Sequence, residues 1–481
     1  MTGLNSEHAS PRSARALSQR LRNLSPGRLL LLVLVAGAVL RLVALDRWSL
    51  WTDEQYGLGL APVYTLDNPA GPPDQHPPLY YLMMQQLIRV STSEAWLRLP
   101  SALAGLVALL FIWKSGVAWQ DRRFALLASA LAAFSPLLIW YGREARMYGP
   151  AIAVWAASIY FYIQSFRRSS WLDAVGLAVS NIIGLYLVYP SLALWLGQMA
   201  LFILFWDMHG RNPGRFVRWF LAQAATAIAF LLWWPYLTLQ MNRSITFNWQ
   251  LPFFDLSGTL AETFRRGLIL AVVLLLIAMG ISLLVTSRSS WRATFNRLAQ
   301  PLSWLAFLGY LAILVLGAVP RGLSVRRQLL VFLIPLILAG AWGMRHLRRP
   351  WLQPAVVVIG LLLAVYTVAS PPFEDWRGAL EFVALQREED ELLFVYPWWR
   401  NASVDYYYPG GLETAELIPI RDLVPGEEPF PQGSSVWVVM NDHPSDTDNS
   451  DRVWQRLDEM GVVELRRQFP RYSEVRRYVI R

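Results

Sequence analysis

Two adjacent carboxylates, Asp53 and Glu54, stand where a long apolar run gives way to a polar loop. Acids are scarce in this part of the chain, since residues 1–370 contain only 13 Asp and Glu. A positioned carboxylate can accept a proton from an alcohol or an amine, as a general base does. The alternative is that both acids cap the next helix, whose positive N-terminal end favours negative charge. We predict that Asp53 is the base and that Glu54 orients it or holds a cation.

A histidine lies further along the same loop, in the segment His-Pro-Pro-Leu-Tyr at residues 76–80. The two prolines fix the backbone and favour a helix start directly after them. His76 is one of only five histidines and is expected on the same side as Asp53, so it is a candidate for phosphate or metal contact. A purely structural histidine is the alternative.

The segment Gly-Arg-Glu-Ala-Arg-Met-Tyr at residues 142–148 joins two apolar runs. Arg143 or Arg146 could clamp a phosphate, because a guanidinium group matches phosphate oxygens with two parallel hydrogen bonds. Glu144 would then be a second acidic ligand. An internal Glu-Arg salt bridge is the alternative.

Three further arginines, Arg321, Arg326 and Arg327, precede an apolar run late in the chain. Arginines at such a position can stabilise the departing phosphate of a lipid-linked donor. They can equally extend their side chains to lipid headgroups, and both interpretations stay open here.

Composition indicates which elements must hold these residues. The chain is 55% hydrophobic and 16% charged, whereas soluble domains carry about 25% charged residues. The repeated apolar runs exclude a soluble globular enzyme, and the absence of cysteine excludes disulfides and thiolate catalysis. We predict a polytopic α-helical membrane protein of about eleven spans, at 29–46, 99–119, 124–141, 150–166, 171–189, 191–208, 219–239, 267–286, 302–319, 329–344 and 351–370.

Charge predicts the orientation of these spans. Residues 1–370 hold 31 Lys and Arg against 13 acids, and residues 371–481 hold 12 against 21, so the net charges are +18 and −9. Positive links are retained in the cytoplasm, and basic links occur at 121–123, 167–168, 211–218, 288–297 and 345–349. We therefore predict a cytoplasmic N-terminus (1–28), a membrane domain (29–370) with an outer loop at 47–98, and an extracytoplasmic domain (371–481). Arginines clustered between apolar runs do not indicate a nucleic-acid partner.

The acidic domain shows a small α/β pattern. Helix-like periodicity occurs at 376–385 and 452–460, and strand-like runs occur at 391–396, 435–440 and 475–480.

The ordered motifs at residues 51–54, 76–80, 144–148 and 327–335 resemble those of the bacterial protein-mannosyltransferase-like and aminoarabinose-transferase-like glycosyltransferases, which have the GT-C fold. The segments 375–378 and 406–408 are also similar to members with an outer C-terminal domain. Gln328 departs from the pattern, since relatives often have tyrosine there.

This resemblance implies inverting transfer of a sugar from a polyprenyl-phosphate donor to an acceptor at the outer membrane face. It implies that Asp53 is the catalytic aspartate and Glu54 its acidic neighbour. A divalent metal ion is an optional cofactor, with Asp53, Glu144 and His76 as candidate ligands. The candidate substrate- and phosphate-binding residues are His76, Tyr80, Arg143, Arg146, Tyr148, Arg321, Arg326 and Arg327.

Two other functions compete with the transferase. A transporter or flippase of lipid-linked sugars also has many spans, but it places ionisable groups inside them, near the midplane. Here the acids gather at one face, which favours the enzyme. A scaffold that binds envelope proteins through its acidic domain is the other alternative. It leaves unexplained the arginines expected on the outer side of the membrane, namely Arg143, Arg146, Arg321, Arg326 and Arg327.

Overall fold

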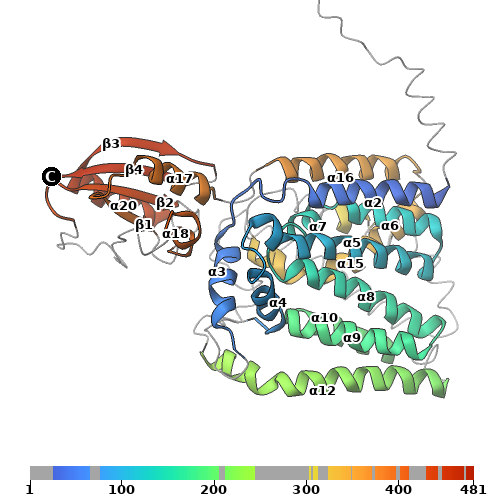
Figure 1. Ribbon diagram of the computed structural model, residues 1–481. Coiled ribbons are helices and arrows are strands. Elements are labelled where there is room, and N and C mark those ends of the chain that lie inside the picture. The colour runs from blue at the N-terminus through green and yellow to red at the C-terminus, as the bar shows by residue number, and fades with distance from the viewer. Residues whose placement is uncertain are drawn as a thin grey trace, which may run out of the picture.

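The computed structural model describes residues 25–65, 76–204, 212–243, 303–304, 307–311, 323–347, 349–370, 374–396, 401–410, 430–441, 447–470 and 473–481. Most of the described chain is helical. A helical bundle is followed by a tail, residues 371–481, that contains a small sheet (Figure 1).

The bundle is built from ten described helices. They are α2 (Pro26–Leu42), α5 (Glu94–Trp119), α6 (Arg122–Ala133), α7 (Pro136–Tyr141), α8 (Tyr148–Arg167), α9 (Trp171–Leu187), α10 (Ser191–Leu204), α12 (Pro213–Arg243), α15 (Leu323–His346) and α16 (Leu352–Ala369). Shorter elements follow α2, namely α3 (Thr52–Leu60), the 3-10 turn η1 (Ala61–Val63) and α4 (Leu79–Ile88).

Three described segments are long and apolar enough to cross a membrane, at Glu94–Trp119, Pro213–Thr238 and Leu352–Ala369. Shorter apolar helices occur at Trp171–Leu187, Ser191–Phe202 and Leu330–His346. The protein is therefore a multi-pass membrane protein. The predicted count of eleven spans is not confirmed, and the spans expected at 267–286 and over most of 302–319 lie outside the described residues.

The span predicted at 124–141 is wrong, because it is two helices. Helix α6 ends at Ala133 and α7 begins at Pro136. Proline lacks an N–H group and disfavours a helical residue before it, and Ser135 is extended. The buried side chain of Arg41 donates to the carbonyls of Ala132 at 3.3 Å and Ala133 at 3.1 Å. These bonds satisfy the free C-terminal carbonyls of α6.

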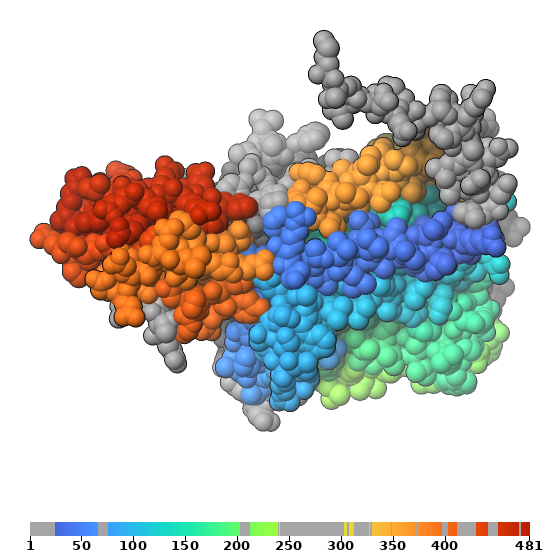
Figure 2. Space-filling model, turned by 45° about the horizontal axis from the view of Figure 1, so that its top comes forward, coloured from blue at the N-terminus to red at the C-terminus, as the bar shows by residue number. Residues whose placement is uncertain are grey.

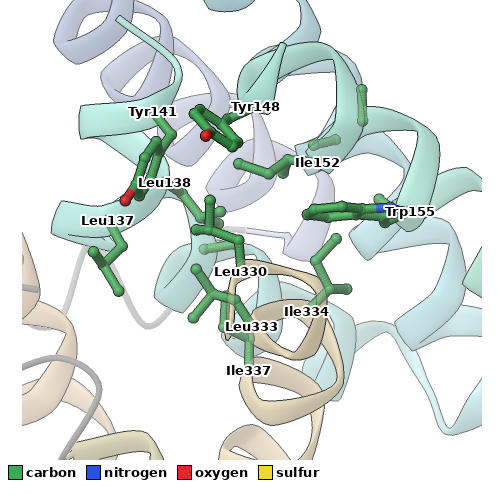
Figure 3. Packing of buried hydrophobic residues seen from close by; sticks show 14 of the residues in the cluster. Leu137, Leu138, Tyr141, Tyr148, Ile152, Trp155, Leu330, Leu333, Ile334 and Ile337 are labelled. Atoms are coloured by element: carbon green, nitrogen blue, oxygen red, sulfur yellow. The ribbon is translucent and has the colours of Figure 1, made fainter. Parts of the chain in front are cut away.

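The bundle core lies where α7, α8 and α15 meet (Figure 3). Leu330, Ile334 and Ile337 of α15 pack toward Trp155 of α8 and Leu138 of α7. Shape-matched packing of this kind holds helices together within a bilayer, where lipid tails are as apolar as leucine. It also fixes the N-terminal end of α15 beside the loop between α7 and α8.

The tail contains a four-stranded sheet of order β1-β2-β4-β3. Its strands are β1 (Leu392–Tyr396), β2 (Ser435–Asn441), β3 (Gly461–Gln468) and β4 (Ser473–Ile480), and only the β1-β2 pair among them is parallel. Helices α17 (Trp376–Gln386), α18 (Asn401–Tyr407) and α20 (Thr447–Met460) complete it. The five elements expected from the sequence are present, whereas α18 and β3 were not predicted.

The tail packs against one end of the bundle, beside α3 (Figures 1 and 2). The basic residues Arg168, Arg218 and Arg345 belong to the other end of their helices, away from α3. We refer to the end that carries α3 as the tail-facing end.

Candidate active site

Helix α3 carries both predicted acids in its first turn. The Asp53 side chain is 28% exposed, and its Oδ2 lies 2.6 Å from Nη1 of Arg327. Arg327 stands in the second turn of α15, far away in the sequence. The structure therefore brings together the candidate base and the arginine that was expected to bind phosphate.

The guanidinium group of Arg327 lies between two aromatic rings. Its Cζ is 5.0 Å from the ring centroid of Trp51 and 5.8 Å from that of Tyr148. Aromatic faces attract cations at such distances. The side chain is still 25% exposed, so a ligand can reach it. The rings therefore hold a cation at a surface that an anion can approach.

Glu54 is not exposed beside Asp53, because its side chain is fully buried. Its carboxylate accepts from Nε and Nη2 of Arg98 at 2.9 and 2.6 Å, and from the backbone N–H groups of Ala145 at 2.6 Å and Trp51 at 3.1 Å. All its contacts hold other parts of the protein. Glu54 therefore fixes the start of α3, which agrees with an orienting role beside Asp53, and its part in catalysis stays a prediction.

Arg98 completes this buried ion pair and was not predicted. Its guanidinium group also donates to the carbonyls of Leu45 at 2.8 Å, Trp48 at 2.7 Å and Ser49 at 2.9 Å. The Arg98 side chain, which belongs to α5, thereby binds both the segment 45–49 that leads into α3 and Glu54 of α3 itself. Within a low-dielectric interior, a pair this well hydrogen-bonded is costly to break from one side.

Arg146 lies directly behind Asp53 and is 3% exposed. Its Nη1 donates to the backbone carbonyl of Asp53 at 2.9 Å, and its Cζ lies 5.5 Å from the ring of Tyr80. The Tyr80 hydroxyl donates to the carbonyl of Ala145. Gly57 permits this packing, since a Cβ there would come within 2.9 Å of the Tyr80 hydroxyl. Arg146 therefore positions the backbone of Asp53 in this structure.

Glu144 is a second buried carboxyl group at the site, only 3% exposed. Its Oε1 accepts from the indole N–H of Trp140 at 2.6 Å, while Oε2 has no hydrogen-bond partner among the described residues. Burial raises the pKa of Glu144 to about 8, and the attraction of Arg327 opposes this rise. The negative charges of Glu54 and Asp53 raise the pKa of Glu144 further. Glu144 is therefore a neutral acid at pH 7.

We expect Glu144 to make the stability of the protein pH-dependent. Its pKa is about 8 when folded and 4.5 ordinarily, so the stabilisation that its protonation provides is complete below pH 4.5 and is lost as the pH rises through 8. The free energy of unfolding should fall by up to about 1.4 kcal/mol per pH unit across this window. Glu144→Gln keeps an acceptor for Trp140 and should lack this decline. Thermal unfolding of both proteins between pH 4.5 and 9 measures the difference, and parallel curves would contradict the expectation.

Arg143, predicted as a phosphate ligand, makes structural contacts. Its Nη1 donates to the carbonyls of Leu40 at 3.1 Å, Arg41 at 3.2 Å and Val43 at 2.8 Å, and its Nη2 donates to that of Ala44 at 2.8 Å. These carbonyls belong to the last turn of α2 and to the two residues that follow it, where backbone acceptors lack partners within the helix. The guanidinium group is bound to that helix end in this structure, and phosphate binding by Arg143 stays a prediction.

The predicted metal ligands are not brought together. No three His, Asp or Glu side chains cluster as a metal site in the part of the chain that the structure describes. Asp53 is paired with Arg327, Glu144 is bound to Trp140, and the backbone carbonyl of His76 accepts from Gln240 at 3.2 Å. These three side chains therefore form no metal cluster among the described residues, and their role as metal ligands stays a prediction.

Other predicted ligands have mixed outcomes. Tyr148 is buried beside Arg327, as noted above, and Tyr80 beside Arg146. Arg321 lies outside the described residues, as does the side chain of Arg326. The described site thus consists of Asp53 and Arg327, supported by Arg146, Glu54 and Arg98.

Comparisons with known proteins bear on this site. Residues 75–238 match the model of the family described as dolichyl-phosphate-mannose-protein mannosyltransferase. No curated protein matches the chain. The match contains His76, Glu144 and Arg146, whereas Asp53 and Arg327 lie outside it.

Solved structures give two further similarities. ArnT from Cupriavidus metallidurans, bound to undecaprenyl phosphate, is 14% identical with a TM-score of 0.45, covering 93% of this chain and 97% of that one. The Archaeoglobus fulgidus oligosaccharyltransferase, in complex with Zn and sulfate, is 11% identical with a TM-score of 0.48, covering 86% and 68%. The family match includes two of the four sequence motifs, those at residues 76–80 and 144–148. The resemblance to the protein-mannosyltransferase-like glycosyltransferases is thereby confirmed over residues 75–238.

Proposed function

We propose that this protein is an inverting glycosyltransferase that moves a sugar from a polyprenyl-phosphate donor to an acceptor at the outer face of the cytoplasmic membrane. The observation that carries the proposal is the contact between Asp53 and Arg327, a base beside a phosphate-binding cation at one end of a membrane bundle. The proposal covers hexosyl and pentosyl donors and acceptors that are proteins, lipids or glycans.

The reaction needs one base and one group that stabilises the leaving phosphate. A carboxylate oxygen of Asp53 takes the proton of the acceptor hydroxyl or amine, and the acceptor atom forms a bond to the anomeric carbon of the sugar. The bond between that carbon and the phosphate oxygen breaks on the opposite side, and polyprenyl phosphate leaves with the electron pair. Arg327 stabilises the negative charge that develops there.

The ion pair suggests how donor binding prepares the base. With no donor present, Arg327 neutralises Asp53 at 2.6 Å. The donor phosphodiester carries one negative charge, as a carboxylate does, and its two non-bridging oxygens match the guanidinium fork. The donor therefore competes for Arg327 and leaves Asp53 free to accept a proton. This order of events keeps Asp53 inactive as a base until the donor is bound.

A flippase of lipid-linked sugars is the alternative function. Such proteins need ionisable groups along the transport path near the membrane midplane. Among the described buried acids of the bundle, Glu54, Glu94 and Glu144 lie with Asp53 at the tail-facing end, and Asp173 lies in the first turn of α9 at the opposite end. None of them lies in the middle of a span, which favours chemistry at a membrane surface.

The orientation of the protein follows from the same proposal. We place the tail-facing end outside, because the links at the other end are basic and the tail carries a net charge of −9. A cysteine introduced at Ser434 should react with an impermeant thiol reagent in intact cells, whereas one at Ser170, an exposed position at the opposite end of the bundle, should not. The chain has no cysteine of its own to interfere. Labelling at both positions would contradict this topology.

The lipid that binds the purified protein tests the proposed donor class. Mass spectrometry of lipids retained after mild solubilisation should reveal polyprenyl phosphate, free or carrying a sugar. Arg327→Ala, purified in parallel, should retain much less of it. Retention of phospholipids alone by both proteins would count against the proposal.

A further inference from the structure

The tail holds the chain segment that leads into α3. Arg377 Nη2 donates to the carbonyls of Asp46 at 2.9 Å and Arg47 at 3.0 Å. The Ser49 hydroxyl donates to the carbonyl of Glu374 at 2.8 Å. Asp46, Arg47 and Ser49 belong to the segment that joins α2 to α3. The tail therefore contacts the residues that immediately precede Asp53.

Tyr407 of α18 is the central residue of this contact. Its hydroxyl accepts from the backbone N–H of Leu50 at 2.5 Å and donates to the carboxylate of Glu94. Glu94 is 6% exposed and also accepts from Arg377 Nη1 at 2.9 Å. A phenol, a carboxylate and a guanidinium group therefore form one partly buried network across the junction of tail and bundle.

Helix α3 itself is bound by α18. The Ser403 hydroxyl donates to the side-chain carbonyl of Gln55, which is buried and donates in turn to the carbonyl of Leu50 at 2.6 Å. Leu50 thus receives contacts from both Tyr407 and Gln55, three residues before Asp53. Bundle residues hold the other side of the same helix start, where Arg98 binds Glu54.

We propose that the tail is a positioning element for the active site, in which Tyr407 and Ser403 of α18 hold the start of α3 so that Asp53 faces Arg327. This inference rests on the proposed function, because it assigns Asp53 a geometry that matters for turnover. Tyr407 is a positioning residue, since it lies against Leu50 and Glu94 and not against the reacting groups. The alternative is that the junction merely attaches the tail to the bundle.

Loss of the Tyr407 hydroxyl distinguishes a junction that positions α3 from one that only attaches the tail. If Tyr407 positions α3, Tyr407→Phe leaves the N–H of Leu50 without its partner and Glu94 with Arg377 alone, and the start of α3 opens more often. If the junction only attaches the tail, the remaining contacts of Arg377 and Ser49 keep α3 as it was. Hydrogen exchange reports such local opening directly.

The test uses the full-length protein in lipid nanodiscs. Amide exchange of peptides covering 50–60 should accelerate about tenfold in Tyr407→Phe, as expected for a lost hydrogen bond to a charged group. The kcat should fall by a similar factor, while the KM for the donor stays within about twofold, since Arg327 is unchanged. Tyr408→Phe is the matched control, because its hydroxyl accepts from Arg387 within the tail at 3.0 Å.

Either of two results would overturn the inference. One is exchange of 50–60 in Tyr407→Phe that equals exchange in Tyr408→Phe, and the other is faster exchange with an unchanged kcat. Ser403→Ala, which removes the contact to Gln55, repeats the test if Tyr407→Phe does not fold. If the wild-type protein turns over no polyprenyl-phosphate donor, the proposed function fails, and the exchange comparison still decides whether α18 holds α3.

Discussion

Replacing Asp53 by asparagine is expected to lower kcat for sugar transfer by about 10² to 10⁴, the usual contribution of a positioned general base. The amide keeps the size of the side chain but cannot accept a proton from the acceptor. The backbone carbonyl of Asp53 still accepts from Arg146, so the start of α3 should keep its place. Donor affinity should be unchanged or higher, because Arg327 no longer has a carboxylate partner.

This prediction is measured by steady-state turnover together with donor binding in the same preparation. Asp46→Asn is a suitable control, because it removes an exposed carboxylate from the same loop and keeps the backbone carbonyl that accepts from Arg377. Turnover close to the wild-type rate in Asp53→Asn would remove Asp53 from the mechanism.

Replacing Arg327 by lysine is expected to weaken donor binding and turnover together, by about 10- to 100-fold, the value of a hydrogen bond between charged groups. Lysine keeps the positive charge but loses the planar fork that binds two phosphate oxygens. It also loses the flat group that lies between the rings of Trp51 and Tyr148. If Arg327 only anchored its helix to lipid headgroups, lysine would serve almost equally well.

The matched control for Arg327 lies on the same helix. Arg345, at the other end of α15, pairs with Asp121 at 2.5 Å, far from the candidate site. Arg345→Lys should therefore leave donor binding and turnover unchanged. Equal tolerance of lysine at both positions would place the phosphate site elsewhere.

Asp53 and Arg327, which are in contact in the structure, stood out in the sequence for physical reasons. Acids are scarce among the first 370 residues, and arginines in outward loops oppose the usual charge bias, so both stood out. That the two side chains meet could not be predicted from spacing, because their contact depends on how α15 packs on α7 and α8.

The roles of Glu54, Arg98 and Arg143 could not be predicted, because each depends on a distant backbone. Glu54 accepts from the N–H of Ala145, and Arg143 binds carbonyls at the end of α2, about 100 residues earlier. No periodicity records such long-range contacts. An arginine that caps a helix end and one that binds phosphate look the same in sequence.

In the tail, strands with buried side chains were predicted and the others were not. β1 and β2 are apolar runs, which are readily recognised, and β4 ends in the apolar run Tyr-Val-Ile at residues 478–480. β3 is an edge strand whose residues are mostly exposed, with arginines among them, so it lacks the expected alternation. Helix α18 has only seven residues, too few for a helical period to appear.

The most direct test of the proposed function is a single-turnover experiment with the purified protein in proteoliposomes, in excess over a polyprenyl-phosphate sugar and supplied with candidate acceptors. The account predicts free polyprenyl phosphate in a one-to-one ratio with sugar on the acceptor, and neither product with Asp53→Asn. Movement of the intact donor across the bilayer without release of polyprenyl phosphate would contradict it and identify the protein as a carrier of lipid-linked sugars.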